Sequence, residues 1–117
     1  MTIRWAIVLL FAAFVWGCNS APAPTPVFSI MADRSYEASL FRQNCAICHG
    51  PEGDGKFLEN GTKVPSLRQG EFKFHTEEEI YKQIANGGNG MTPFRDQLTD
   101  RELHLMAAFV RDRLRGH

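Results

Sequence analysis

Apolar and polar residues alternate along the chain in blocks that separate an apolar start, a proline-rich stretch and a helical region. Residues 5–16 form an uninterrupted apolar run. Farther along, Tyr36 and Leu40 recur at helical spacing within residues 34–46. This pattern predicts a first helix with Asp33 as its N-cap.

Two capping boxes predict two further helices. Thr76 and Glu79 form the first, and Thr99 and Glu102 form the second, because in this motif each side chain caps the backbone of the other. We expect the first of these helices to end at Asn86-Gly87 and the second to run to about Leu114. The apolar stripe predicted for the last helix consists of Leu103, Met106, Ala107, Val110 and Leu114.

Residues 50–75 show no periodic pattern and contain glycines at positions 50, 53, 55, 61 and 70. We therefore expect a long loop between the first two helices. The predicted fold is all-α, with three main helices and long loops.

Two thiols and an imidazole lie together at the end of the first predicted helix, in Cys45-Ala46-Ile47-Cys48-His49. This C-x-x-C-H spacing is typical of covalent haem attachment, in which each thiol adds to one vinyl group of the porphyrin. The adjacent histidine is then held under the iron as an axial ligand. Zinc proteins and thiol-redox proteins also use C-x-x-C, so both alternatives remain open at this point.

The N-terminus accounts for the third cysteine of the chain. A positive charge, an apolar core shorter than a spanning helix and a small residue at Gly17 are typical of a secretory signal. The alternative is a short anchor that is not cleaved. Val15-Trp16-Gly17-Cys18 resembles a bacterial lipoprotein processing box, and this resemblance implies lipidation of Cys18. We therefore expect a signal peptide at residues 1–17.

Proline alternates with small residues just after Cys18, which favours an extended polyproline conformation. We expect residues 18–32 to be the lipidated N-terminus and linker, and residues 33–117 to be the folded domain. Four apolar residues near the end of this linker are open to two interpretations, packing on the domain or contact with lipid. They are Val27, Phe28, Ile30 and Met31.

Charge excludes one class of function and size favours a cofactor. The chain has 13 Lys and Arg against 13 Asp and Glu, so it lacks the basic excess of a nucleic-acid-binding protein. Neither sign dominates, and no strong electrostatic steering is expected. A domain of this size is small for a self-sufficient core, and an embedded haem would add apolar mass.

A methionine thioether is the natural partner of histidine on haem iron. Met91 lies in a loop between glycines and a proline and is the preferred sixth ligand. Met106 belongs to the apolar stripe of the last predicted helix, and Met31 precedes the domain. His75 is expected at the surface, although it could replace Met91. Arg68 either contacts the haem carboxylates or is an ordinary solvated side chain.

Taken in order, these motifs resemble those of class I monohaem cytochromes c. The matching residues are Leu40-Phe41, the C-x-x-C-H motif, Pro65-Ser66-Leu67, Gly90-Met91-x-Pro93-Phe94 and Phe109. The resemblance implies a cytochrome c fold around one covalently bound haem c, attached at Cys45 and Cys48 and ligated by His49 and Met91. It also implies that the Pro65 carbonyl orients His49, that Leu67 packs on the haem, and that Phe41 meets Phe109.

The function expected from this reading is transfer of single electrons at a membrane surface within a respiratory chain, without catalysis. The alternative is a labile Met91 ligand, which would leave an iron open to peroxide or a small gas. Expected partners are redox proteins or a membrane respiratory complex, with the membrane reached through a lipid anchor and no role for nucleic acid. We expect an exported protein on the periplasmic or extracytoplasmic side.

Overall fold

The computed structural model describes residues 22–23 and 26–116. The predicted signal peptide and Cys18 lie outside the described residues. The elements follow in the order α1 (Tyr36–Asn44), α2 (Ala46–His49), β1 (Lys56–Phe57), β2 (Lys63–Val64), α3 (Glu77–Asn86), α4 (Asp100–Ala108) and the π-helical segment η1 (Phe109–Leu114). Within the described residues, no helix has the length and apolar character needed to cross a bilayer.

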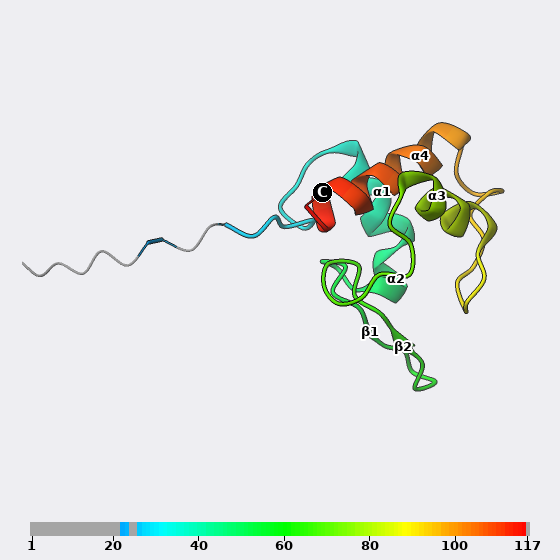
Figure 1. Cartoon of the computed structure of the whole chain (residues 1–117), viewed down its shortest axis with the longest axis horizontal. Coiled ribbons are helices and arrows are strands. Elements are labelled where there is room, and N and C mark those ends of the chain that lie inside the picture. Colours follow the sequence, from blue (N-terminus) through cyan, green and yellow to red (C-terminus); the bar gives the residue numbers. More distant parts are fainter. Residues whose placement is uncertain (1–21, 24–25, 117) are drawn as a thin grey trace, which may run out of the picture.

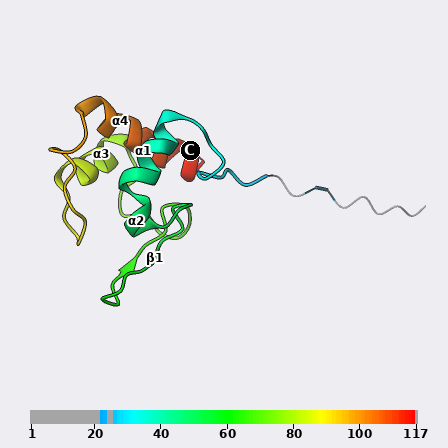
Figure 2. The ribbon, with the colours of Figure 1, turned by 180° about the vertical axis from the view of Figure 1, so that it is seen from behind.

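Helices α1, α3 and α4 form the main body, with α4 lying against both of the others (Figure 1). The short helix α2 and the β1–β2 hairpin extend from one side of this body, and the loop after α3 extends from the same side (Figures 1 and 2). The hairpin pairs Lys56 with Val64 and Phe57 with Lys63. The predicted loop thus contains a small antiparallel ladder that the sequence pattern did not indicate.

The start of α1 differs from the prediction. The N-cap is Ser35, whose side chain accepts a hydrogen bond from the Ala38 backbone N–H at 3.2 Å. Asp33 instead accepts from the Ser35 backbone N–H at 2.9 Å and from its hydroxyl at 3.0 Å. The predicted cap therefore holds the true cap, and the helix begins two residues later than expected.

The two predicted capping boxes are both present, at Thr76 with Glu79 and at Thr99 with Glu102. In each, the threonine side chain accepts from a backbone N–H, and the glutamate accepts from the threonine backbone N–H, as this motif requires. The last helix also reaches Leu114 as predicted, although its final residues form the wider π-helical segment η1.

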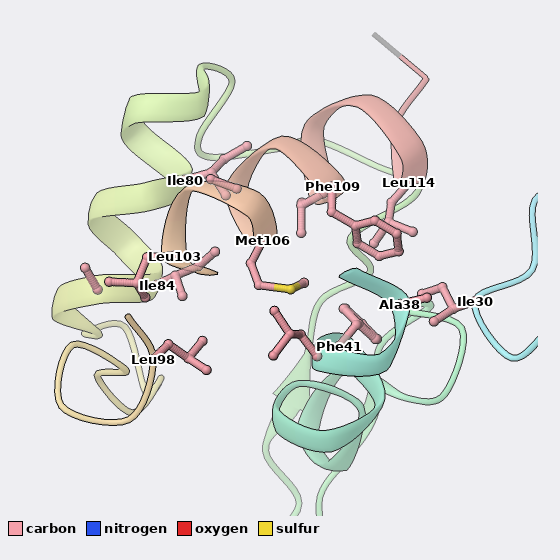
Figure 3. Packing of buried hydrophobic residues seen from close by; sticks show 14 residues of the cluster. Ile30, Ala38, Phe41, Ile80, Ile84, Leu98, Leu103, Met106, Phe109 and Leu114 are labelled. Carbon is pink, nitrogen blue, oxygen red and sulfur yellow. The ribbon is translucent and has the colours of Figure 1, made fainter. Parts of the chain in front are cut away.

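A single apolar cluster fills the space between the helices (Figure 3). Met106 is 1% exposed and points from α4 toward α1, as expected of a core residue. Phe41 and Phe109 meet with ring centroids 6.1 Å apart, which confirms the predicted contact between the first and last helices. The cluster consists of Ile30, Ala38, Leu40, Phe41, Ile80, Ile84, Ala85, Leu98, Leu103, Met106, Ala107, Phe109, Val110 and Leu114.

Residues 28–33, which we call the N-terminal strap, pack on the domain although the sequence assigned most of them to the linker. Ile30 is fully buried in the core, and the Phe28 ring lies edge-on to Phe109 with centroids 5.9 Å apart. Val27 and Met31 are exposed. Phe28 and Ile30 thus pack on the domain, whereas Val27 and Met31 do not. The packed domain begins at Phe28 rather than Asp33.

A matched pair of variants, one in the strap and one at the residue just before it, tests the packing of the strap. In the holoprotein, Ile30→Ala is expected to lower the free energy of unfolding by about 2–5 kcal/mol, because a buried aliphatic side chain leaves a cavity. Val27→Ala, at a position 83% exposed, should change it by no more than about 0.5 kcal/mol. Denaturant titration measures both, and equal effects would contradict the packing of the strap.

Candidate haem site

The C-x-x-C-H motif lies where α1 ends and α2 begins. Cys45 separates the two helices, and its backbone N–H donates to the Phe41 carbonyl at 2.8 Å. Helix α2 then carries Cys48 and His49, with the His49 N–H donating to the Cys45 carbonyl at 2.9 Å. Neither cysteine is in a disulfide. Burial, and to a lesser extent the charge of Cys48, raises the pKa of the half-buried Cys45 to about 12, so Cys45 is a protonated thiol.

The His49 ring is held with one nitrogen inside the protein. Its Nδ1 is buried and has no hydrogen-bond partner of regular geometry. Burial lowers the pKa of His49, and the nearby Pro65 carbonyl opposes this shift. The carbonyl therefore acts on the ring without being fully aligned with Nδ1. A small adjustment would give the ring N–H to carbonyl bond that metal-ligating histidines commonly make.

Close backbone packing holds Pro65 near His49. The Gly55 N–H donates to the His49 carbonyl at 2.8 Å. A Cβ at Gly55, where φ is +79°, would lie 2.4 Å from the Val64 carbonyl oxygen and 2.8 Å from the Pro65 carbonyl carbon. Only glycine fits there. Leu67, which packs against the core, donates its N–H to the Gly53 carbonyl at 2.8 Å.

Met91 follows a tight turn that begins at Gly88. The Gly88 N–H donates to the Met91 carbonyl at 2.9 Å, and the Met91 N–H donates to the Gly88 carbonyl at 3.0 Å. Both central residues have positive φ, +54° at Asn89 and +85° at Gly90, as in the Asn-Gly turns of hairpins. Just before the turn, a Cβ at Gly87 would lie 2.6 Å from the Met91 carbonyl oxygen.

Gln83 of α3 fixes this turn, a role that the sequence did not indicate. Its side-chain amide donates to the Gly88 carbonyl at 2.9 Å and contacts the Met91 sulfur at 3.7 Å. After the turn, the Phe94 N–H donates to the Ile84 carbonyl at 3.0 Å. The partly buried Met91 side chain thus has a defined place against α3 and the core. No pattern reveals Gln83, because a glutamine on a helix face is ordinarily a solvated residue.

Two arginines also have structural roles that the sequence did not show. Arg68, a candidate for haem carboxylates, has a side chain only 9% exposed and donates to the Phe28 carbonyl at 2.9 Å. Arg115, which follows η1, donates to the Leu67 carbonyl at 3.3 Å and to the Phe74 carbonyl at 2.5 Å. Both guanidinium groups therefore bind backbone carbonyls of segments that are distant in the sequence.

The remaining histidines within the described residues lie at the surface. His75 is exposed, as expected, and its backbone N–H donates to Glu79 at 3.0 Å. His104 is exposed on α4 and stacks on Tyr81 with ring centroids 4.3 Å apart. His104 Nδ1 is 3.6 Å from a Glu77 carboxylate oxygen. It links α3 to α4 rather than facing the C-x-x-C-H motif.

These groups fit a covalently held haem. The C-x-x-C-H motif offers two free thiols and an imidazole whose inner nitrogen is buried beside a carbonyl. Met91 belongs to the loop after α3, and this loop extends from the same side of the helical body as α2 (Figures 1 and 2). Bound haem would supply an iron that changes oxidation state by one electron. Residues 22–23 and 26–116 contain no cluster of three or more His, Cys, Asp or Glu side chains able to hold a metal ion, so the zinc alternative finds no ligand set there.

Comparison with known proteins gives one consistent family. A family model described as cytochrome C oxidase, cbb3-type, subunit III matches residues 36–110. Cytochrome c6 of Thermosynechococcus vestitus is 33% identical over 84 residues, which cover 72% of this chain and 73% of that protein. The cbb3-type cytochrome c oxidase subunit FixP of Sinorhizobium medicae is 34% identical over 84 residues, which cover 62% of this chain and 27% of that subunit.

A solved structure agrees with these relatives. The KustC0563 c-type cytochrome superimposes with a TM-score of 0.54 at 32% identity, and the match covers 62% of this chain and 90% of that one. This likeness confirms the predicted cytochrome c fold. The chain therefore belongs to the family of monohaem c-type cytochromes, which transfer electrons through one covalently bound haem c.

Proposed function

We propose that this protein carries single electrons through a haem attached to Cys45 and Cys48, with His49 and Met91 as the axial ligands. The observation that carries the proposal is the buried, unpartnered Nδ1 of His49 beside the Pro65 carbonyl. A carbonyl in that place fixes the tautomer, so that Nε2 is the nitrogen left for the iron. With His49 and Met91 filling both axial positions, a bound haem would exchange electrons with little rearrangement and would offer no site for a substrate.

We further propose that the protein works on the extracytoplasmic side of a membrane, within a respiratory chain. The apolar run before Cys18 and the resemblance of residues 15–18 to a lipoprotein box support export and lipid anchoring. The similarity to FixP, a subunit of a cbb3-type oxidase, supports a redox partner that is a membrane complex. Several acyl chains would make such an anchor stable, where one chain alone is marginal.

Loss of either thiol tests the attachment. Cys45→Ala and Cys48→Ala should each remove one of the two thioether bonds, and the double variant should abolish covalent haem, because only these thiols belong to the motif. Haem staining after denaturing electrophoresis measures the covalent fraction. Covalent haem retained in the double variant would contradict the assignment.

Changes at Met91 test the sixth ligand. Met91→His should lower the reduction potential, because histidine with methionine gives a higher potential than two histidines. Met91→Ala should open the iron to carbon monoxide, visible as a shift in the reduced absorption spectrum. Met31→Ala, at a residue 59% exposed in the strap, is the matched control and should change neither property.

The wild-type spectrum separates the proposal from its alternative. A low-spin, six-coordinate reduced form that does not react with carbon monoxide is expected. Ready binding of carbon monoxide by the wild type would instead indicate a labile Met91 and a peroxidase or gas-sensing role.

Substitution of Cys18 tests the anchor. In the native host, Cys18→Ser should move the holoprotein from the membrane fraction to the soluble extracytoplasmic fraction, because the residue that would bear the lipid is lost. Membrane extraction followed by haem staining measures the distribution. A variant that remains in the membrane fraction would contradict lipid anchoring at this residue.

A further inference from the structure

The Glu52 carboxylate is the point at which the N-terminal strap joins the loop that follows His49. It accepts hydrogen bonds from the Ser29 hydroxyl at 2.8 Å, the Ile30 N–H at 2.7 Å and the Met31 N–H at 3.1 Å. Burial alone would raise the pKa of Glu52, but these donors and the charge of Arg68 together hold that pKa below its usual value. The carboxylate is therefore ionised and fully engaged.

Arg68 makes the opposite half of the same contact. Its Nη2 lies 3.1 Å from the Glu52 carboxylate, and its Nε donates to the Glu52 backbone carbonyl. Its Nη1 donates to the Phe28 carbonyl at 2.9 Å. A second carboxylate, Asp54, is 3.9 Å away and more than half exposed. One guanidinium thus ties together the strap, the turn at Glu52 and its own segment.

Both charged residues are close in the chain to the groups that face the haem motif. Glu52 lies in the turn closed by the Gly53 N–H and the Gly50 carbonyl at 3.1 Å, directly after His49. Arg68 follows Leu67, whose N–H donates to the Gly53 carbonyl. The ion pair and this hydrogen bond therefore run side by side between the loop after His49 and the segment after Pro65.

We propose that Glu52 and Arg68, held by the N-terminal strap, are positioning residues that keep the Pro65 carbonyl in register with His49. The proposal rests on His49 being the haem ligand. The pair acts through position: it fixes where residues 65–67 lie against residues 49–53. The relative position of these segments determines how strongly the Pro65 carbonyl contacts the imidazole. Because the pair is largely shielded from water, loss of either partner leaves the other charge and several donors unmatched.

The reduction potential distinguishes this role from direct electrostatics. A carbonyl bonded to the ring makes the imidazole more basic and favours the oxidised iron, so loss of register should raise the potential. Direct electrostatics gives opposite signs: loss of the negative Glu52 would raise the potential, and loss of the positive Arg68 would lower it. Positioning therefore predicts that Glu52→Gln, Arg68→Gln and the double variant all raise the potential by similar amounts.

Arg68→Lys provides the sharpest single comparison. Lysine keeps the charge but lacks the planar fork that contacts Phe28 and Glu52 together. Positioning predicts a raised reduction potential for this variant, whereas direct electrostatics predicts no change in the potential. The exposed pair Glu78 and Lys82, with side chains 59% and 62% exposed, supplies controls, and Glu78→Gln and Lys82→Gln should leave the potential unchanged.

Hydrogen exchange gives a second readout that does not depend on the iron ligands. The Leu67 amide should exchange faster in the Glu52 and Arg68 variants than in the wild type, while the Ile80 amide at the start of α3 should be unaffected. If a glutamine variant fails to fold, Ser29→Ala removes one donor to Glu52 and should shift both readouts in the same direction, less strongly.

Two results would overturn the proposal. One is a potential that rises in Glu52→Gln and falls in Arg68→Gln, with Arg68→Lys unchanged. The other is unchanged Leu67 exchange in all variants. A wild-type spectrum without histidine ligation would instead refute the proposed function, and exchange at Leu67 would still report whether the pair holds the two segments together.

Discussion

The backbone after His49 passes so close to residues 64–66 that no side chain fits at Gly55, and the histidine side of the site depends on this approach. It brings the Pro65 carbonyl to the buried imidazole nitrogen and places Leu67 against the core. A hydrogen bond at each end maintains it, from Gly55 to His49 and from Leu67 to Gly53. Close backbone packing therefore places the carbonyl that orients the imidazole, whereas in many metal sites a hydrogen-bonding side chain orients it.

The methionine side is built from different parts of the chain. Its turn is fixed by Gln83 and by the carbonyl of Ile84, both on α3. The histidine side instead continues from α1 and is braced by the strap. The two sides meet through α4 and η1, which contact α1, α3 and the strap. The distance between the two proposed ligands thus depends on how the last helix packs, and a direct hydrogen bond joins the two loops, from the Lys73 amine to the Asn89 side chain at 3.0 Å.

Features encoded by neighbouring residues were predictable, and features formed between distant residues were not. The capping boxes at Thr76 and Thr99 and the core position of Met106 follow from local spacing, and the structure bears them out. The ligand assignments to His49 and Met91 remain predictions. The sequence does not predict docking of the strap, because an apolar residue such as Ile30 suits a protein core and a lipid surface equally well. From the sequence, Arg68 is an ordinary solvated loop residue. Its partners Phe28 and Glu52 lie 40 and 16 residues away in the chain, so only the fold shows these contacts.

Under the proposed lipid anchoring at Cys18, docking of the strap would also limit how far the domain can lie from the membrane. If Cys18 carries lipid, only residues 19–27 separate the bilayer surface from Phe28, because the following residues are bound to the domain. Nine extended residues span at most about 32 Å, and a proline-rich conformation spans about 28 Å. The span of this linker is comparable to the diameter of a small domain. It would confine electron exchange to a thin layer over the membrane, within which the donor and acceptor must both present their redox centres.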